Sequence, residues 1–437
     1  MHIPPSPDVT LTTRQRIRSI VAGSSGNLIE YYDWYVYAAF SLYFAHAFFP
    51  HGSQTAELLR TAAIFAIGFL MRPIGGWVMG LVADRHGRRF ALSISVLAMC
   101  AGSLTIALCP GYDSIGIAAP AILLLARLVQ GLSLGGEYGA SATYLSEIAP
   151  PAQRGFYASF QYVTLVAGQL LALVVLLLLQ FVILTPQQLG AWGWRVPFGI
   201  GALLALSVLW FRRGMAESEQ FRNATRDPAA AGGLRVLLRH PREVISVCGL
   251  TLGGTVAFYT FTIYMQKYLV NTTGLSREQS TVVSTTALAI FALAQPAFGA
   301  LSDRVGRRPL LLSFGVIGCI VTVPLMHALG QAHSPRMALL LVVVALLCIS
   351  GYTSINAVVK AELFPTRIRA LGVALPYALT VSIFGGTAEY VALWFKEAGH
   401  EEWFYWYVTG CIACSLLTVL FLLPARDSIT SGTQESV

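Results

Sequence analysis

The stretch GLVADRHGRR at Gly80–Arg89 is repeated as GALSDRVGRR at Gly299–Arg308, and each copy directly follows an apolar run of membrane-spanning length. Six of the ten positions are identical, although 219 residues separate the two copies. A second set of residues repeats at an offset of 215: Glu147, Pro150 and Arg154 are matched by Glu362, Pro365 and Arg369. Any short turn in a membrane protein collects arginines, but chance rarely reproduces the acid, the glycines and their spacing as well. The two similar offsets indicate one half-length unit that occurs twice in parallel.

The composition indicates an integral membrane protein. Apolar residues make up 55% of the 437 residues and charged residues only 11%, whereas an average soluble chain has about 25% charged residues. Windows of about 20 apolar residues predict twelve membrane-spanning helices. They cover residues 17–48, 61–83, 90–109, 120–147, 155–183, 194–212, 243–269, 281–302, 309–330, 338–364, 369–395 and 403–424. The predicted fold is therefore all-α, with two six-helix bundles at 1–212 and 243–437 and a polar central loop at 213–242.

The distribution of basic residues predicts the orientation in the membrane. The loops on the side of the repeated motif hold most of the arginines, including seven between residues 212 and 242. The loops on the other side hold Arg60, Arg277, Arg336 and Lys396. Because basic loops stay in the cytoplasm, both termini and the central loop are expected there. The net charge of +8 then reflects orientation and anionic lipid headgroups rather than nucleic acid.

The sequence lacks the patterns of enzymes and of metal or nucleotide sites. No Walker A motif, zinc signature or nucleophile elbow is present, and the eight histidines are scattered. Cys411 and Cys414 have the spacing of a redox motif, but they lie in a predicted membrane helix, where packing is the expected role. We expect no catalytic residue, no metal and no cofactor.

The repeated turn combines groups that can hold two helices together. Asp84 ends one predicted helix, Gly80 permits close helix approach, and Gly87 permits a tight turn. The carboxylate can accept hydrogen bonds from arginines or from the amides at the N-terminus of a neighbouring helix. A contact made in only one conformation would act as a latch; the alternative is that the turn only anchors the topology. The predicted gating motif comprises Gly80, Asp84, Arg85, His86, Gly87 and Arg88, and in the second copy Gly299, Asp303, Arg304, Gly306 and Arg307. His86 is expected to be a solvated loop residue rather than a proton carrier.

Arg72 is predicted to lie at membrane depth. It precedes Asp84 by twelve residues, or about 18 Å of helix, which is near the middle of a hydrocarbon core of about 30 Å. A buried guanidinium needs an anionic partner, and its planar fork fits a carboxylate. The partner is either a substrate carboxylate or a permanent internal acid, Glu30 or Asp33.

Several buried acids are candidates for carrying a proton, because burial favours the neutral form of a carboxyl group. Glu30 and Asp33 lie three residues apart on one face of the first helix. Glu137 and Glu389 lie in the fourth and eleventh helices, and Arg127 could modulate one of the acids. The sequence does not select one of them.

Other polar residues of the predicted helices are candidates for the substrate site. Gln161, Tyr162, Tyr259 and Asn356 lie near mid-depth, although tyrosines at helical spacing are also common in packing. Arg195 either contacts substrate or extends to the outer interface beside Trp192 and Trp194. Lys267 and Lys360 are expected to extend to the membrane interface in the same way.

The motifs together resemble the major facilitator superfamily. G-x-x-x-D-R-x-G-R-R after helices two and eight is typical of it, and RLVQGLSLGGEYG at Arg127–Gly139 resembles its R-x-x-Q-G-x-x-x-G motif. The segments at Ser24–Tyr37, Phe69–Trp77, Gly135–Pro150 and Arg154–Ala172 are similar to the metabolite:proton symporter branch. Within that branch, Tyr259–Thr272, Phe364–Leu375 and Phe384–Leu393 resemble bacterial α-ketoglutarate permeases.

The resemblance implies a secondary transporter of the bacterial inner membrane that works by alternating access. It implies symport of protons with α-ketoglutarate; the alternatives are other dicarboxylates, citrate, shikimate or zwitterions such as proline and betaine. The expected partners are a small anionic metabolite, protons and the lipid bilayer, with no nucleic acid, and the protein is expected to function as a monomer. A polytopic enzyme would need a clustered acid, histidine or metal constellation, and a channel or sensor would show no counterflow.

Overall fold

The computed structural model describes residues 13–86, 88–133, 149–212, 237, 239–365 and 368–423, and these residues form helices and short connections without any strand. Two predicted site residues, Gly87 and Glu137, lie outside the described residues. The side chains of Asp84, Arg85 and Arg88 lie outside them as well. The all-α prediction is confirmed.

Twelve long helical segments of the described residues build the bundle. The first six are α1 (Thr13–Phe48), α2 (Gln54–His86), α3 (Arg88–Leu108), α5 (Ala118–Ser133), α7 (Arg154–Leu178) continued by the π-helix η2 (Leu179–Ile183), and α9 (Val196–Arg212). The next three are α12 (Pro241–Tyr259) continued by η5 (Thr260–Tyr264) and α13 (Met265–Asn271), α14 (Arg277–Val305), and α15 (Arg307–Gly330). The last three are α16 (Pro335–Thr353) with α17 (Asn356–Glu362), α18 (Arg369–Thr380) with η6 (Val381–Gly385) and α19 (Ala388–Glu397), and α20 (Glu401–Phe421). Short elements connect them: α4 (Tyr112–Ile115), η1 (Pro151–Gln153), α8 (Pro186–Ala191) and η3 (Gly193–Arg195).

Eight helical segments of the described residues are long and apolar enough to cross a membrane, and two shorter apolar helices accompany them. Their surfaces have the pattern expected in lipid. Large apolar side chains such as Trp77 and Leu293 are exposed, at 69% and 80%, whereas Gln130 and Lys267 are fully buried. Polar groups inside and apolar groups outside are what a bilayer requires.

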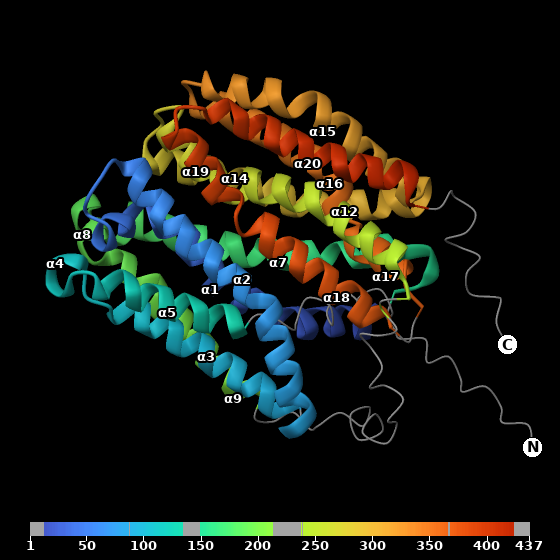
Figure 1. Ribbon diagram of the computed structural model, residues 1–437, viewed down its shortest axis with the longest axis horizontal. Helices are drawn as coiled ribbons and strands as arrows, with labels where there is room; N and C mark the ends of the chain where they lie inside the picture. The colour runs from blue at the N-terminus through green and yellow to red at the C-terminus, as the bar shows by residue number, and fades with distance from the viewer. Residues whose placement is uncertain are drawn as a thin grey trace, which may run out of the picture.

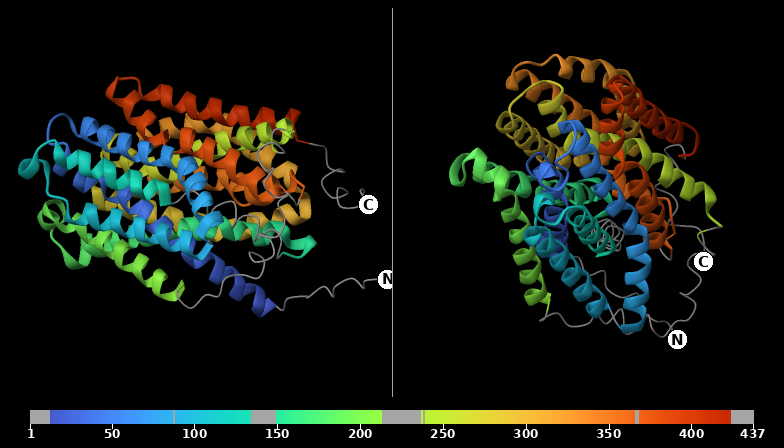
Figure 2. Two further views of the ribbon diagram at one scale, coloured as in Figure 1. Left: turned by 60° about the horizontal axis from the view of Figure 1, so that its bottom comes forward. Right: turned by 60° about the vertical axis from the view of Figure 1, so that its left-hand side comes forward.

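The helices form two groups that pack side by side (Figures 1 and 2). In the first group, α2 packs on α5, α3 packs on α9 and α1 packs on α7. In the second group, α12 and α15 both pack on α20, and α14 packs on α16. We call the helices up to Arg212 the first half and those from Pro241 the second half. The halves meet where α7 contacts α14 and where α2 contacts α19.

Two glycines of the sequence motifs have structural roles that a larger residue could not fill. A Cβ at Gly131 would lie 2.1 Å from the carbonyl oxygen of Gly68, so α5 and α2 could not pack this closely with a larger residue. Gly306 ends α14 with a φ of 93°, a conformation that residues with a Cβ rarely adopt. The sharp turn between α14 and α15 therefore depends on the glycine of the second DRxGRR copy.

Three helices of the second half are interrupted near mid-length. π-Helical turns interrupt the helices at Thr260–Tyr264 and Val381–Gly385, and Ser354 and Ile355 separate α16 from α17. A π-turn adds a residue and so rotates every side chain that follows it. Irregular backbone at membrane depth commonly borders a binding site, and these three interruptions flank the residues described next.

Candidate functional site

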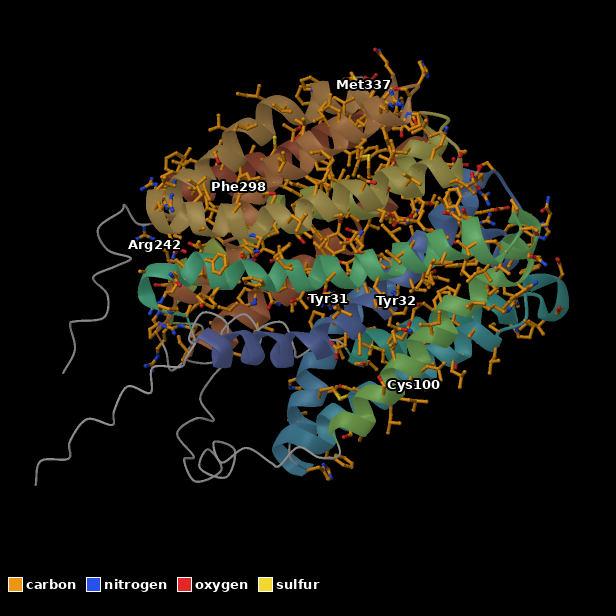
Figure 3. The ribbon with its side chains drawn as sticks, turned by 180° about the vertical axis from the view of Figure 1, so that it is seen from behind. Tyr31, Tyr32, Cys100, Arg242, Phe298 and Met337 are labelled. Atoms are coloured by element: carbon orange, nitrogen blue, oxygen red, sulfur yellow. The ribbon has the colours of Figure 1, made fainter. Side chains whose placement is uncertain are left out.

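Arg72 lies between the two halves, surrounded by tyrosines. We call Tyr31, Tyr259 and Tyr377 the tyrosine cage. The Arg72 side chain is only 9% exposed, and its guanidinium is 5.0 Å from the ring centroid of Phe69 on the same helix. Tyr31 of α1 and Tyr259 of α12 are among the tyrosines that lie near it. Figure 3 shows Tyr31 near the centre of the bundle. The sequence places Arg72 near the middle of the membrane, and the structure shows its side chain buried in the bundle.

Neutral groups surround Arg72. Among the described residues, no carboxylate oxygen lies within 4.0 Å of its guanidinium nitrogens. Asp33, one of the two predicted internal partners, instead accepts hydrogen bonds from Ser103 and from Gln130, the latter at 2.7 Å. In the described part of the chain, the Arg72 charge therefore has no carboxylate in direct contact.

The R-x-x-Q-G motif links Arg127 to Asp33. The Arg127 side chain is fully buried and donates a hydrogen bond of 2.9 Å to the amide oxygen of Gln130, whose amide nitrogen donates to Asp33. The guanidinium also lies 3.8 Å from the Trp34 ring centroid and 4.4 Å from that of Tyr37. Two of the predicted proton-coupling residues thus share one network inside the first half.

Lys267 and Glu389 form a buried ion pair, with 3.2 Å between Nζ and Oε2. Sequence reasoning assigned Lys267 to the membrane interface, but its side chain is fully buried. Its ammonium also donates a hydrogen bond of 2.7 Å to the carbonyl oxygen of Ala38 in α1. The pair therefore connects the second half to the first at the level of the interrupted helices.

Lys360 is a second buried lysine that the sequence did not indicate as a site residue. Its ammonium donates to the Tyr352 hydroxyl and to the Asn356 side-chain oxygen, both at 3.1 Å, and lies 4.4 Å from the Tyr377 ring centroid. Asn356, a predicted substrate residue, thus contacts a cation. Tyr377 is also one of the tyrosines that lie near Arg72.

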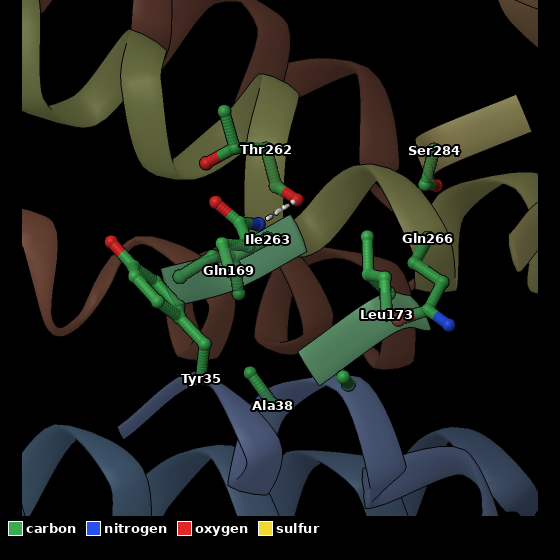
Figure 4. Close-up of a pocket in the computed structure, with 9 residues that line it drawn as sticks. Tyr35, Ala38, Gln169, Leu173, Thr262, Ile263, Gln266 and Ser284 are labelled. Atoms are coloured by element: carbon green, nitrogen blue, oxygen red, sulfur yellow. Dashed lines mark hydrogen bonds between the residues drawn. The ribbon is translucent and has the colours of Figure 1, made fainter. Parts of the chain in front are cut away.

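A small pocket of about 10 Å³, with room for about one water molecule, lies between the halves beside the tyrosine cage (Figure 4). The first half lines it with Tyr35, Ala38, Ala39, Gln169 and Leu173, and the second half with Thr262, Ile263, Gln266 and Ser284. The Gln169 amide nitrogen crosses the interface to the carbonyl oxygen of Thr262 at 2.8 Å. Within the described part of the chain, its amide oxygen and the Ser284 hydroxyl have no hydrogen-bond partner. Such buried polar groups favour a polar occupant.

The other predicted site residues lie in different places. Gln161 and Tyr162 are buried on α7, and the Tyr162 ring lies 5.3 Å from that of Phe258. Glu30 is buried on α1. Arg195 is not part of the cage: its guanidinium donates to the backbone oxygens of Cys109 and Ala191, and it stacks on Trp194. Its partners are loop and helix-end groups at the end of the bundle away from the DRxGRR turns, as the interfacial interpretation expects.

The second DRxGRR copy joins the two halves. Asp303 accepts hydrogen bonds from the backbone amides of Gly155 and Phe156 at the start of α7, at 2.8 and 2.9 Å. Arg307 donates to the same carboxylate at 2.7 Å and lies 4.0 Å from Glu362. A carboxylate at a helix N-terminus is stabilised by the free amides and the helix dipole. We call this end of the bundle the motif end. In the first copy, His86 is exposed beside Phe90.

The halves also touch at the end opposite the motif end. Gln180 of the first half donates to the hydroxyl of Thr281 in the second, at 3.2 Å, and the Arg277 guanidinium lies 5.1 Å from the Tyr43 ring centroid. Ser53 donates to Glu397 at 3.2 Å. Contacts at both ends enclose the pocket and the cage between them.

Known proteins with similar sequences are transporters. The chain is 55% identical to "Alpha-ketoglutarate permease" of Escherichia coli strain K12 over 94% of both chains. It is 34% identical to a citrate-proton symporter of Salmonella typhi over 94% of this chain and 96% of the relative.

Similar folds are found among solved transporter structures. The xylose transporter of E. coli in a partially occluded inward-open conformation superposes with a TM-score of 0.71, with 21% identity over 94% of this chain and 97% of the other. The family model for sugar (and other) transporters matches residues 19–231 and again residues 230–433, so each match covers one copy of the repeat. The chain is a multi-pass membrane transporter that belongs to the sugar (and other) transporter family of the major facilitator superfamily.

Proposed function

We propose that the protein takes up α-ketoglutarate together with protons across the bacterial inner membrane. The observation that carries this proposal is Arg72, a buried guanidinium held by neutral tyrosines with no described acid within 4.0 Å. An isolated charge at membrane depth costs at least a few kcal/mol. A substrate carboxylate can offset that cost with two parallel charge-assisted hydrogen bonds. The α-ketoglutarate permease relative, at 55% identity, supports this substrate.

The buried acids provide two places for the coupled proton. Asp33 lies in the network with Gln130 and Arg127, and Glu389 is paired with Lys267. We favour Asp33, because protonation there would leave Arg127 with only Gln130 and the aromatic rings as partners. Such a change would alter the position of α1, which carries both Asp33 and Tyr31 of the cage. Glu30 and Glu137 remain candidates from the sequence.

Transport requires the cage to open to each side in turn. We propose that the halves 1–212 and 243–437 rock about Arg72 and that the loop 213–242 joins them as the monomer moves in the bilayer. The Asp303 contact with α7 would hold the motif end closed in one conformation and release it in the other. From the arginine distribution, we propose that the motif end and both chain termini face the cytoplasm.

Purified protein in liposomes tests this function. An inward proton gradient should drive accumulation of labelled α-ketoglutarate, and an uncoupler should abolish it. Unlabelled α-ketoglutarate inside the vesicles should accelerate entry of the label, as expected of a carrier. Labelled citrate, succinate, shikimate, proline and betaine, tested in the same way, identify the substrate if α-ketoglutarate is not taken up. Sodium-driven uptake that survives the uncoupler would contradict proton coupling.

A further inference from the structure

We propose that Lys360 binds the second carboxylate of the substrate, so that one dicarboxylate bridges Arg72 of the first half and Lys360 of the second. This inference rests on the proposed function, since it assumes that Arg72 holds the first carboxylate. Lys360 lies on α17, directly after the break between α16 and α17, and its side chain is fully buried.

Lys360 has only neutral partners among the described residues. Tyr352 and Asn356 accept its hydrogen bonds at 3.1 Å, the Tyr377 ring faces it at 4.4 Å, and no carboxylate oxygen lies within 4.0 Å. Lys267, which is equally buried, is paired with Glu389 at 3.2 Å. The difference matters because a buried charge needs a counter-charge.

The four buried cations of the described residues therefore fall into two classes. Lys267 has an acid in direct contact, and Arg127 is linked to Asp33 through Gln130. Arg72 and Lys360 have hydroxyl, amide and aromatic partners only. Two positive charges without internal acids match the two negative charges of a dicarboxylate.

Tyr377 connects the two cations. It is one of the tyrosines near Arg72, and its ring centroid lies 4.4 Å from the Lys360 ammonium. A five-carbon dicarboxylate separates its carboxyl carbons by about 5 Å, from C–C bonds of about 1.5 Å. Hydrogen bonds of about 2.9 Å at each end extend its reach. A dianion of this length can contact two cations that flank one aromatic side chain.

The bridge would explain both selectivity and closure. A monocarboxylate would neutralise Arg72 and leave Lys360 buried without a counter-charge. Because the two cations belong to different halves, a dianion between them would stabilise the closed arrangement of the halves more than a monoanion could. Lys360 would then be a residue that determines specificity for two carboxylates.

The experiment measures how strongly the protein distinguishes α-ketoglutarate from 2-oxopentanoate, which has the same carbon chain without the second carboxylate. The purified parent protein, Lys360→Gln and Lys360→Arg are compared in detergent by binding and in liposomes by counterflow. Lys360→Gln should weaken α-ketoglutarate binding roughly ten- to hundredfold, the range for a charged hydrogen bond. It should leave 2-oxopentanoate binding nearly unchanged, and Lys360→Arg should retain part of the preference. Lys396→Gln, which removes a lysine paired with Glu401 at the opposite end, serves as the matched control.

The remaining outcomes also decide the matter. If Lys360→Gln keeps the parental preference for the dicarboxylate, the second carboxylate binds elsewhere. If it loses both ligands equally, Lys360 supports the fold rather than the second carboxylate, and the proposal is wrong. If the parent protein transports a different dicarboxylate, the proposed substrate fails, while the same comparison with that dicarboxylate and its monocarboxylate analogue still tests Lys360.

Discussion

Asp303, near the end of α14, accepts a hydrogen bond of 2.8 Å from the backbone amide of Gly155 at the start of α7. The bond joins the two halves, and Arg307 fixes the carboxylate by a bond of 2.7 Å from its own helix. The same glycine also sets the distance between the helices, since a Cβ there would lie 2.6 Å from the carbonyl oxygen of Gly299. The repeated turn is therefore a contact between halves in its second copy, beyond any role in topology.

Asp303→Asn should slow transport while leaving membrane insertion intact. The amide keeps the size of the side chain but has one acceptor oxygen in place of two, and it removes the charge that the helix N-terminus stabilises. That loss is worth roughly 1 kcal/mol or more, so initial uptake rates should fall severalfold. Asp113→Asn, on the exposed helix α4, is the control and should transport as the parent does. If Asp303→Asn transports at the parental rate, the contact contributes to packing but not to transport. From the repeat, we expect Asp84→Asn to slow transport in the same way.

Gly155→Ala should disturb the closed motif end by steric means alone. The added Cβ would lie 2.1 Å from the Ser302 hydroxyl oxygen and 2.6 Å from the Gly299 carbonyl oxygen. Overpacking of this kind typically costs about 1–3 kcal/mol, and that cost falls only on conformations in which α7 touches α14. Uptake should drop roughly tenfold at equal protein levels. Gly410→Ala is the matched control, because nothing lies within 4 Å of a Cβ there; equal rates for the two variants would show that α7 and α14 move apart without difficulty.

Asp33→Asn should separate substrate movement from the proton gradient. The amide can still interact with Ser103 and Gln130 but cannot release a proton, so the variant would behave as a permanently neutral Asp33. We expect loss of gradient-driven accumulation with counterflow of α-ketoglutarate retained. The comparison variant is Glu389→Gln, which changes another buried acid of the described residues. If Asp33→Asn accumulates substrate normally and Glu389→Gln does not, the proton is carried by the pair with Lys267.

The fold and part of the site follow from the sequence, but the burial of Lys267 and Lys360 could not be predicted from it. Apolar runs and the DRxGRR repeat depend only on local composition and spacing, so the all-α bundle could be predicted. Lys267 and Lys360 were assigned to the interface because each lies near the end of an apolar run. The π-turn at Thr260–Tyr264 rotates the residues that follow it, and the break before Asn356 starts a new helix. Lys267 follows the π-turn, Lys360 follows the break, and both side chains are fully buried. Neither interruption can be read from a regular helical period.

The hydrogen-bond partners of the buried acids could not be predicted from the sequence either. Glu30 and Asp33 share a helical face in the sequence, which made either a plausible partner for Arg72. Asp33 is held by Ser103 and Gln130, two residues that lie 70 and 97 positions away in the chain. Only the packing of α1 against α3 and α5 brings them together. Spacing along one helix therefore identified the charged residues but could not assign their partners.

Arg72→Lys should abolish or severely reduce transport of α-ketoglutarate, although the positive charge remains. Lysine loses the planar two-donor fork that holds a carboxylate in fixed register, and its shorter reach would also weaken the contacts with Tyr31 and Tyr259. Affinity should fall about tenfold or more, measured by binding and by uptake on the same preparation. Arg336→Lys, at the exposed start of α16, is the matched control.

The two measurements on Arg72→Lys distinguish a substrate contact from a structural charge. If Arg72 only balanced an internal acid, a lysine would preserve much of the binding, because a point charge suffices for that purpose. Lost affinity with normal insertion supports direct contact with the carboxylate, whereas normal affinity with slow uptake would mean that Arg72 acts in the conformational change. A variant that both binds and transports α-ketoglutarate normally would exclude Arg72 as the carboxylate site. Arg127 would then be the next residue to test ahead of Arg195, since Arg127 is fully buried beside Trp34 and Arg195 contacts loop carbonyls away from the cage.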